Sequence, residues 1–328
     1  MKICIFGAGA IGGMIGSLLK KNGNEVVLIA RGEHYNKIKN EGLLFVSKEY
    51  DLEICQKFDV FDSPNNLGKF DLVINGLKAH SSNINAPAVS LLLSDDSILL
   101  PTLNGVPWWF FYKFKGKYND YKISSVDPNN IQWKLFNPAK VLGCVVYPAA
   151  TISKPGQIEH IEGKRLILGE PDNIRSERVL KISKLFIEAG LKAPISKNIR
   201  SDIWLKLIGN SSFNPLSIIT QSTLKQMCEN LETKTIVKKM MSEANDIARK
   251  LDIPIKLDID KRIEGARLVG NHLTSTLQDY LNKKPLELDP LLKSLIELGK
   301  LTETSTPTLE TIYNLARYFA IKNSCNPN

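Results

Sequence analysis

Three polar side chains recur at intervals of four within an otherwise apolar stretch. The stretch reads SDIWLKLIGNSSFNPLSIIT (201–220), and the three residues are Lys206, Asn210 and Asn214. Residues four apart share one stripe of an α-helix, so the sequence predicts a helix that presents one ammonium and two amides together. A partly buried lysine gives up its proton readily, which suits a general acid. The alternative is a lysine at a helix edge whose stem crosses apolar surface to reach water.

A glycine-rich loop stands at the start of the chain, after the short apolar run KICIF and before the helical pattern GGMIGSLLKK. It spells G-x-G-x-x-G, and its residues are Gly7, Ala8, Gly9, Ala10, Ile11 and Gly12. Between a strand and a helix, this pattern is typical of dinucleotide-binding loops. The glycines let the backbone approach a pyrophosphate, whose charge the helix N-terminus stabilises. A simple packing turn is the alternative.

The end of the second apolar strand bears on which dinucleotide is bound. That strand, VVLIAR, ends at Arg31, about 20 residues after Gly12. NAD sites usually place a carboxylate there for the ribose hydroxyls, whereas an arginine pairs with the 2′-phosphate of NADP. We therefore expect NADPH as the cofactor. Glu33, two residues later, keeps NAD as the alternative.

Two more polar residues follow predicted strands. FDLVING ends just before Lys78, and DSILLPTLNG ends at Asn104 and Gly105. Ligands of open α/β sheets bind outside the carboxyl ends of the strands. Lys78 is therefore either a contact of the nicotinamide ribose or substrate carboxylate, or a solvated turn residue. Asn104 is either a holder of the nicotinamide end or a turn residue as well.

The order of these patterns predicts the fold class and the domains. Strand and helix signals alternate through the N-terminal half, which indicates a parallel sheet covered by helices. From about residue 140, short β-like runs separated by Pro and Gly predict antiparallel strands that extend the sheet, and a helix follows at about 175–190. After Arg200, amphipathic helical patterns dominate. We expect an α/β protein with a Rossmann-type dinucleotide-binding domain at 1–197 and an all-α domain at 198–328.

Composition narrows the classes of function. Hydrophobic residues make up 43% and charged residues 23% of the 328 residues, as in a soluble globular protein, and no stretch approaches a membrane span. The five cysteines are scattered and the four histidines isolated, so we expect no disulfide and no metal site. The net charge of +9 comes from dispersed lysines, which predicts no nucleic-acid partner. We expect a cytoplasmic protein.

The segment PWWFFYKFKGKYND (107–120) concentrates seven aromatic residues among lysines. Either it is a lid or an association surface, or it is a partly buried segment that covers the sheet.

Taken in order, these motifs resemble those of the ketopantoate reductases (2-dehydropantoate 2-reductases). The motifs are GAGAIG, LKA at 77–79, LNG at 103–105, WLKLIGNSSFNP at 204–215, and TSTLQD followed by LELD at 274–289. The resemblance implies NADPH-dependent reduction of 2-dehydropantoate to (R)-pantoate, in pantothenate and coenzyme A synthesis. It implies an active site between the two domains, and a monomer or homodimer as the assembly.

The resemblance also implies roles for individual residues. Lys206 matches the family's catalytic lysine, and Glu287 matches the glutamate that engages substrate and orients the site. Asn210, Asn214 and Ser275 match substrate-binding residues. Lys78 and Asn104 match contacts of cofactor and substrate.

The region from Pro107 to about Trp133 has no counterpart in the shorter members of the family, which leaves the identity of the 2-oxo acid open. One alternative function is therefore NADPH-dependent reduction of another 2-oxo acid. The other is a non-catalytic NADP-binding regulator, which would not need Lys206 and Glu287 together.

Overall fold

The computed structural model describes residues 1–325. The chain divides into two compact units. Unit 1 comprises residues 1–103, 108–122 and 129–199, and unit 2 comprises 104–107, 123–128 and the chain from Arg200 onward. The backbone therefore passes between the units five times.

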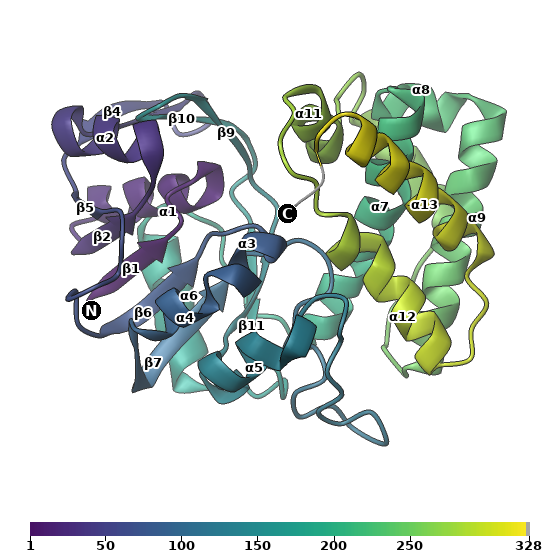
Figure 1. Cartoon of the computed structure of the whole chain (residues 1–328), viewed down its shortest axis with the longest axis horizontal. Coiled ribbons are helices and arrows are strands. Elements are labelled where there is room, and N and C mark those ends of the chain that lie inside the picture. Colours follow the sequence, from purple (N-terminus) through teal and green to yellow (C-terminus); the bar gives the residue numbers. More distant parts are fainter. Residues whose placement is uncertain (326–328) are drawn as a thin grey trace. The chain divides into compact units, whose positions relative to one another are not determined.

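A five-stranded parallel sheet forms the centre of unit 1, with strand order β5-β2-β1-β6-β7 (Figure 1). The central strands are short, wholly apolar or nearly so, and buried, as expected of parallel strands that are covered on both faces. The strands are β1 (Ile3–Phe6), β2 (Val26–Ile29), β5 (Asp59–Phe61), β6 (Phe70–Asn75) and β7 (Leu93–Pro101). The helices of this unit are α1 (Ala10–Lys21), α2 (Gly32–Glu41), α3 (Ala79–Ile84), α4 (Ala86–Ser90), α5 (Ile131–Phe136) and α6 (Glu177–Glu188). This confirms the predicted Rossmann-type class.

The strands after residue 140 match only in part the prediction that they extend the parallel sheet. They are β8 (Gly143–Val146), β9 (Ala149–Lys154), β10 (Gln157–Glu162) and β11 (Leu166–Gly169). Two of them, β9 and β10, join β3 (Leu43–Ser47) and β4 (Leu52–Gln56) in a separate sheet of order β4-β3-β10-β9. The other two, β8 and β11, pair with each other, and isolated bridges join Val141, just before β8, to Leu99 of β7 and Leu168 of β11 to Ile195. The parallel pairing of β10 with β3 joins segments more than 100 residues apart, which local patterns cannot reveal.

The four consecutive aromatic residues at the start of the aromatic segment are buried in unit 1. Trp108, Trp109, Phe110 and Phe111 are each no more than 1% exposed. This burial contradicts an association surface made of these four rings and favours the alternative of a covering segment.

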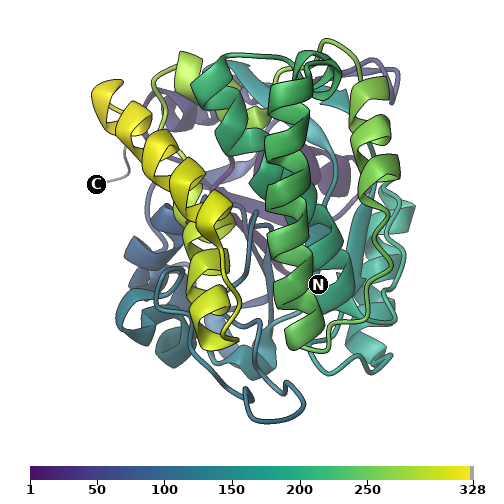
Figure 2. The same cartoon turned by 90° about the vertical axis from the view of Figure 1, so that its right-hand side faces the viewer.

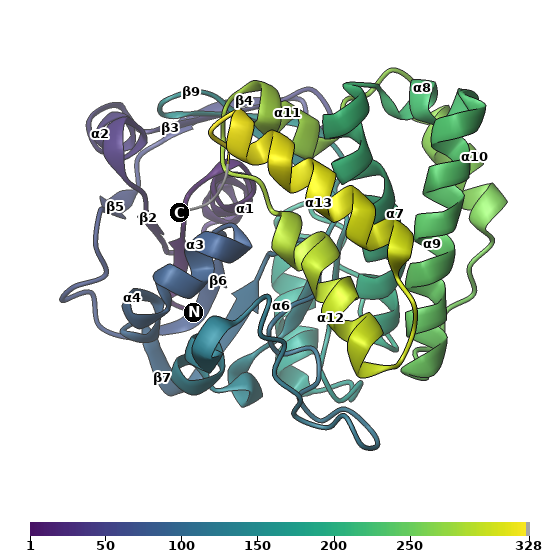
Figure 3. The same ribbon diagram turned by 45° about the vertical axis from the view of Figure 1, so that its right-hand side comes forward.

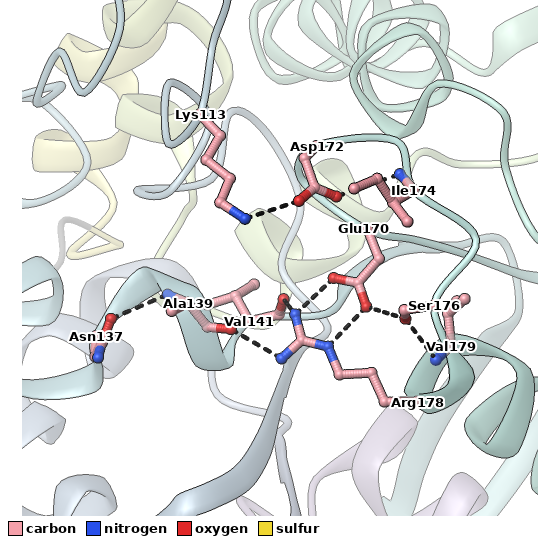
Figure 4. A network of polar contacts seen from close by, with 10 residues as sticks. All are labelled: Lys113, Asn137, Ala139, Val141, Glu170, Asp172, Ile174, Ser176, Arg178 and Val179. Atoms are coloured by element: carbon pink, nitrogen blue, oxygen red, sulfur yellow. Dashed lines mark hydrogen bonds and ion pairs between the residues drawn. The ribbon is translucent and has the colours of Figure 1, made fainter.

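A network of hydrogen bonds and ion pairs connects the aromatic segment and the loops near it (Figure 4). The buried carboxylate of Glu170 accepts two hydrogen bonds from the guanidinium of Arg178, which also donates to the backbone carbonyls of Ala139 and Val141. Nearby, the ammonium of Lys113, within the aromatic segment, pairs with Asp172. Because a buried charge is costly unless paired, this network specifies one arrangement of these loops.

Within residues 1–325, unit 2 consists of helices and loops and contains no strand. Its helices are α7 (Ile199–Thr220, which begins at the last residue of unit 1), α8 (Leu224–Glu229), α9 (Leu231–Lys250), α10 (Ile259–Leu268), α11 (Ser275–Leu281), α12 (Ser294–Leu301) and α13 (Pro307–Lys322), with one π-helical turn, η3 (Asp289–Lys293). Helices α13 and α9 pack together, as Figure 2 shows for the yellow and green helices. Figure 3 labels α7 and α9 within this bundle. The indole N–H of Trp204 on α7 donates to the carbonyl of Ala244 on α9, which fixes α7 against α9.

Candidate active site

The glycine-rich loop is packed tightly against the ends of β1, β2 and β6. The backbone N–H groups of Gly7 and Ala8 both donate to the carbonyl of Ile29, at distances of 3.1 and 2.9 Å. A Cβ on Gly12 would lie 2.3 Å from the carbonyl oxygen of Gly7, and one on Gly76 would lie 2.6 Å from that same oxygen. Only glycine fits at these two positions, because a Cβ at such distances overlaps the backbone.

Gly9 has the opposite environment. A Cβ on Gly9 would meet no heavy atom within 4 Å. Gly9 is also the N-cap of α1, where no side chain caps the helix and the first turn carries no acidic residue. An uncapped helix N-terminus with open space before it fits the pyrophosphate of a dinucleotide.

Two residues follow β2 beside this loop. Arg31 is exposed and is the N-cap of α2. His34, in the first turn of α2, connects the loop to the β9–β10 turn: its Nε2 donates to the carbonyl of Ala8 over 2.9 Å, and its Nδ1 accepts from the N–H of Gly156 over 3.0 Å. Burial lowers the pKa of His34, against the opposing effect of the hydrogen bond to Ala8. Both contacts suit the neutral ring, with its proton on Nε2.

Lys78 lies beyond the end of β6. This strand pairs with β1, which leads into the glycine loop. It is the half-buried N-cap of α3 and comes two residues after Gly76. A Cβ on Gly7 would meet the side chain of Leu77 at 2.8 Å, so the residue before Lys78 contacts the loop directly.

In unit 2, α7 carries the polar stripe expected from the sequence. Lys206 and Asn210 are half-buried and Asn214 is buried, and all three lie within one continuous helix. The ammonium of Lys206 donates to the side-chain oxygen of Asn104 over 2.8 Å. The structure therefore joins two of the predicted residues by a direct hydrogen bond, although they are 102 positions apart in the sequence.

The segment that carries Asn104 is held by the π-helical turn η3. The N–H of Val106 donates to the carbonyl of Pro290 over 2.9 Å. Gly105 has φ +85°, and a Cβ there would lie 2.2 Å from the same carbonyl oxygen. The turn is tied to α13 by Tyr313, whose hydroxyl donates to Asp289 over 2.8 Å. Burial, aided by this contact, raises the pKa of Tyr313. Single π turns are frequent at functional sites.

A chain of hydroxyl groups connects α7 with the start of α11. Ser217 Oγ donates to the carbonyl of Asn214 over 2.6 Å, so the hydroxyl of Thr274, 2.6 Å away, is the donor to Ser217. Thr274 in turn caps α11 by accepting from the N–H of Leu277. Ser275, the first residue of α11, is exposed next to this cap.

Glu287 is half-buried and lies in the loop that leads into η3. Its neighbour Leu286 is anchored by a backbone hydrogen bond to Cys325. Three residues after Glu287, Pro290 contacts Gly105, so Glu287 and Asn104 belong to two segments that touch.

The predicted residues thus fall into two sets. Unit 1 holds the glycine loop, Arg31 and Lys78, and unit 2 holds the remainder: Asn104, Lys206, Asn210, Asn214, Ser275 and Glu287. His34 could not be found from the sequence, because an isolated histidine three residues after Arg31 fits no motif. Within residues 1–325, no cluster of His, Cys, Asp or Glu could hold a metal ion. No helix in that range is both long and apolar enough to cross a bilayer.

Two family models match the chain. One is described as ketopantoate reductase PanE/ApbA and matches residues 3–108. The other is described as the C-terminal part of ketopantoate reductase PanE/ApbA and matches residues 198–320. The two matches cover the glycine loop and the α7 stripe respectively.

Individual relatives agree with these matches. A 2-dehydropantoate 2-reductase from Mesorhizobium japonicum is 40% identical over 99% of both chains. A crystal structure from Ralstonia solanacearum, assigned as a ketopantoate reductase, is 33% identical with a TM-score of 0.93 over 98% of both chains. The fold is also that of a D-mandelate dehydrogenase solved with NADH and anilino(oxo)acetate, which is 23% identical with a TM-score of 0.85 over 99% of this chain and 100% of that one.

Proposed function

This chain belongs to the ketopantoate reductase family of oxidoreductases, and from that premise we propose that it reduces 2-dehydropantoate to (R)-pantoate with NADPH. The observation that carries the proposal is the hydrogen bond from Lys206 to Asn104, because it ties the one cation of the α7 stripe to a strand-end residue of the kind that meets a ligand.

The loop of unit 1 supports dinucleotide binding. The open space at Gly9 and the uncapped start of α1 accept the pyrophosphate, and the close packing of Gly7, Gly12 and Gly76 keeps the loop in shape. Arg31 pairs with the 2′-phosphate, which favours NADPH over NADH. The bound cofactor supplies a hydride to the keto carbon.

The residues of α7 handle the charge that develops on substrate. As the keto carbon is reduced, negative charge grows on its oxygen. Lys206 stabilises that charge and then delivers the proton that completes the hydroxyl group. Asn104 accepts a hydrogen bond from the same ammonium and so keeps it aimed in the absence of substrate.

Neutral groups hold the rest of the substrate. Asn210, Asn214 and Ser275 bind its carboxylate and hydroxyl, and the Thr274–Ser217 contact supports this role by connecting the turn of Asn214 with the start of α11. Glu287 offsets the cost of burying the ammonium and orients it. In this proposal the protein acts in the cytoplasm, as a monomer or homodimer, in the synthesis of pantothenate and coenzyme A.

Reduction of another 2-oxo acid is the second candidate. One observation favours it: the fold is shared with the D-mandelate dehydrogenase solved with NADH and anilino(oxo)acetate. A steady-state assay of purified protein separates the candidates. We expect 2-dehydropantoate to give the highest kcat/KM in a panel of 2-oxo acids, and NADPH to be preferred over NADH. A higher kcat/KM for a different 2-oxo acid would replace the first candidate by the second, and binding of NADPH without oxidation by any member would favour a regulator.

A further inference from the structure

Helix α7 contains a glycine that local structure does not require. Gly209 lies in the middle of a helix of 22 residues and is buried. Glycine in a helix interior costs about 1 kcal/mol relative to alanine. Its φ is not in the left-handed region, so backbone conformation does not explain it. A close approach by another group is the remaining explanation for a glycine at this position.

That group is the guanidinium of Arg262, from the first turn of α10. A Cβ on Gly209 would lie 2.6 Å from Nη2, 3.2 Å from Nε and 3.3 Å from Cζ of Arg262. The two nitrogens lie nearest and the central Cζ farthest, so the guanidinium turns its Nε–Nη2 edge toward Gly209 and leaves the side of Nη1 and Nη2 for a ligand. Any larger residue at 209 would displace it.

This places a permanent positive charge beside the proposed substrate-binding stripe. Gly209 is three residues after Lys206, and residues three apart are neighbours on a helix surface. It directly precedes Asn210. The backbone of Arg262 is fixed, since its N–H donates to the carbonyl of the α10 N-cap, Asp258. Within residues 1–325, no hydrogen bond or ion pair engages the guanidinium itself, and Arg262 is exposed.

A charge at this position supplies what the neutral residues lack. A 2-oxo acid carries a carboxylate next to its keto group, and Asn210, Asn214 and Ser275 offer only neutral hydrogen bonds to it. A guanidinium presents two parallel N–H donors that match a carboxylate, and such charge-assisted bonds are stronger than neutral ones.

We propose that Arg262, resting on Gly209, binds the carboxylate of the 2-oxo acid and makes the enzyme prefer the acid over neutral carbonyl compounds. This inference rests on the proposed function, because it assumes that a 2-oxo acid binds along α7. It assigns Arg262 as a specificity-determining residue and leaves proton delivery with Lys206.

Two substitutions test the role from different sides. Arg262→Gln removes the charge, whereas Gly209→Ala keeps the charge and moves the guanidinium. Arg249→Gln is the matched control, since it removes one positive charge from an exposed arginine of α9 that pairs with Asp246 of the same helix. Each variant is assayed at saturating NADPH with 2-dehydropantoate and with its neutral lactone, which lacks the carboxylate.

We expect Arg262→Gln to lower kcat/KM for the acid by about tenfold or more, the usual effect of losing a hydrogen bond to a charged group. Activity on the lactone and the KM for NADPH should stay at wild-type values. Gly209→Ala should lower the acid-to-lactone ratio in the same direction without a fall in Tm, because alanine favours the helix. Arg249→Gln should behave as wild type.

An unchanged acid-to-lactone ratio in both variants overturns the proposal, as does an equal loss with both substrates. If Arg262→Gln does not fold, the ratio in Gly209→Ala decides alone. The wild-type enzyme tests the proposed function separately. If the wild-type enzyme prefers another 2-oxo acid, that acid and its neutral ester replace 2-dehydropantoate and its lactone in the test of Arg262. If it reduces no 2-oxo acid, both the proposed function and the role of Arg262 are wrong.

Discussion

Lys206 and Asn104 are joined by a hydrogen bond of 2.8 Å between the ammonium and the side-chain amide oxygen, across 102 residues of sequence. Asn104 follows β7 of unit 1, yet it belongs to unit 2, where the carbonyl of Pro290 holds its segment. The ammonium is therefore aimed by a loop whose own position depends on the π-helical turn η3.

Removal of the ammonium should abolish most of the turnover. We expect Lys206→Ala to lower kcat at least about 100-fold, since general acid catalysis contributes about 10²- to 10⁴-fold. Lys239→Ala, at an exposed position of α9, is the control and should keep wild-type kcat. Steady-state kinetics at saturating NADPH measure the effect, with circular dichroism to verify folding. Near-normal turnover in a folded Lys206→Ala variant would exclude Lys206 as the proton donor.

Reversal of the charge at Arg31 should change the cofactor preference. In Arg31→Asp a carboxylate repels the 2′-phosphate of NADPH and accepts from the ribose hydroxyls of NADH. We expect the ratio of kcat/KM for NADPH to that for NADH to fall by at least about tenfold, because a charge-assisted pair is lost. Arg175→Asp, at another exposed arginine of unit 1, makes the same change of charge and should leave the ratio unaltered. Equal NADPH-to-NADH ratios of kcat/KM in Arg31→Asp and Arg175→Asp would disprove the assignment of Arg31 to the 2′-phosphate.

Gly9 and Gly12 should respond differently to alanine. In Gly12→Ala the Cβ would lie 2.3 Å from the Gly7 carbonyl, so we expect the free energy of unfolding to fall by about 1–3 kcal/mol. In Gly9→Ala the methyl group meets nothing within 4 Å. We therefore expect little change in Tm but a Kd for NADPH raised about tenfold or more, because the pyrophosphate needs that space. Calorimetric titration and thermal melting without cofactor distinguish the two, and wild-type affinity in Gly9→Ala would contradict the assignment of the loop.

Gly105 can be compared with Gly116, since both have positive φ (+85° and +88°). Alanine is strained at either position, but only at Gly105 would its Cβ overlap Pro290, while Gly116 has open space. We expect Gly105→Ala to lose about 1–3 kcal/mol more unfolding free energy than Gly116→Ala. Its kcat should fall as well, because Asn104 shifts with its neighbour. Urea unfolding and steady-state kinetics measure the two effects. Equal unfolding free energies for Gly105→Ala and Gly116→Ala would show that Pro290 can move away from the new Cβ without loss of stability.

The contacts of His34 predict how stability depends on pH. Burial lowers its pKa in the folded protein below the ordinary value of 6.5. As the pH falls below that value, the unfolded chain takes up the proton first, so the stability that neutral His34 contributes is present at pH 7 and is lost as the pH falls through the folded-state pKa. Protonation also makes Nδ1 a donor that faces the N–H of Gly156.

The matched variant for this prediction is His34→Gln, which does not titrate. We expect the difference in unfolding free energy between wild type and variant to shrink between about pH 7 and pH 5. Urea unfolding at several pH values measures this difference, and the other three histidines cancel because both proteins contain them. A difference that stays constant over this range would show that His34 does not titrate there.

The elements that local patterns predict are the ones found. The apolar run before GAGAIG is β1, the stretch 201–220 lies within α7, and the helix expected at about 175–190 is α6. Each has a continuous apolar run or a periodic pattern that one short window contains.

What the sequence could not predict depends on distant partners. The sheet β4-β3-β10-β9 needs β3 to meet β10, and His34 gains its role only when the loop and the β9–β10 turn flank it. Gly209 was the one local sign of Arg262, because a glycine inside a helical pattern costs stability, but its partner lies on α10.

Two short segments limit how this protein can be divided into separate fragments. They are 104–107 and 123–128, which belong to unit 2 although both flank the aromatic segment of unit 1. A gene fragment cut near residue 199 would encode the first segment without the Pro290 carbonyl that Val106 binds, and the second without the Glu297 carboxylate that accepts from the N–H groups of Ser124 and Ser125. The complementary fragment would lack the partner of Lys206. Co-expressed halves would therefore have to reassemble before either could adopt its native loops.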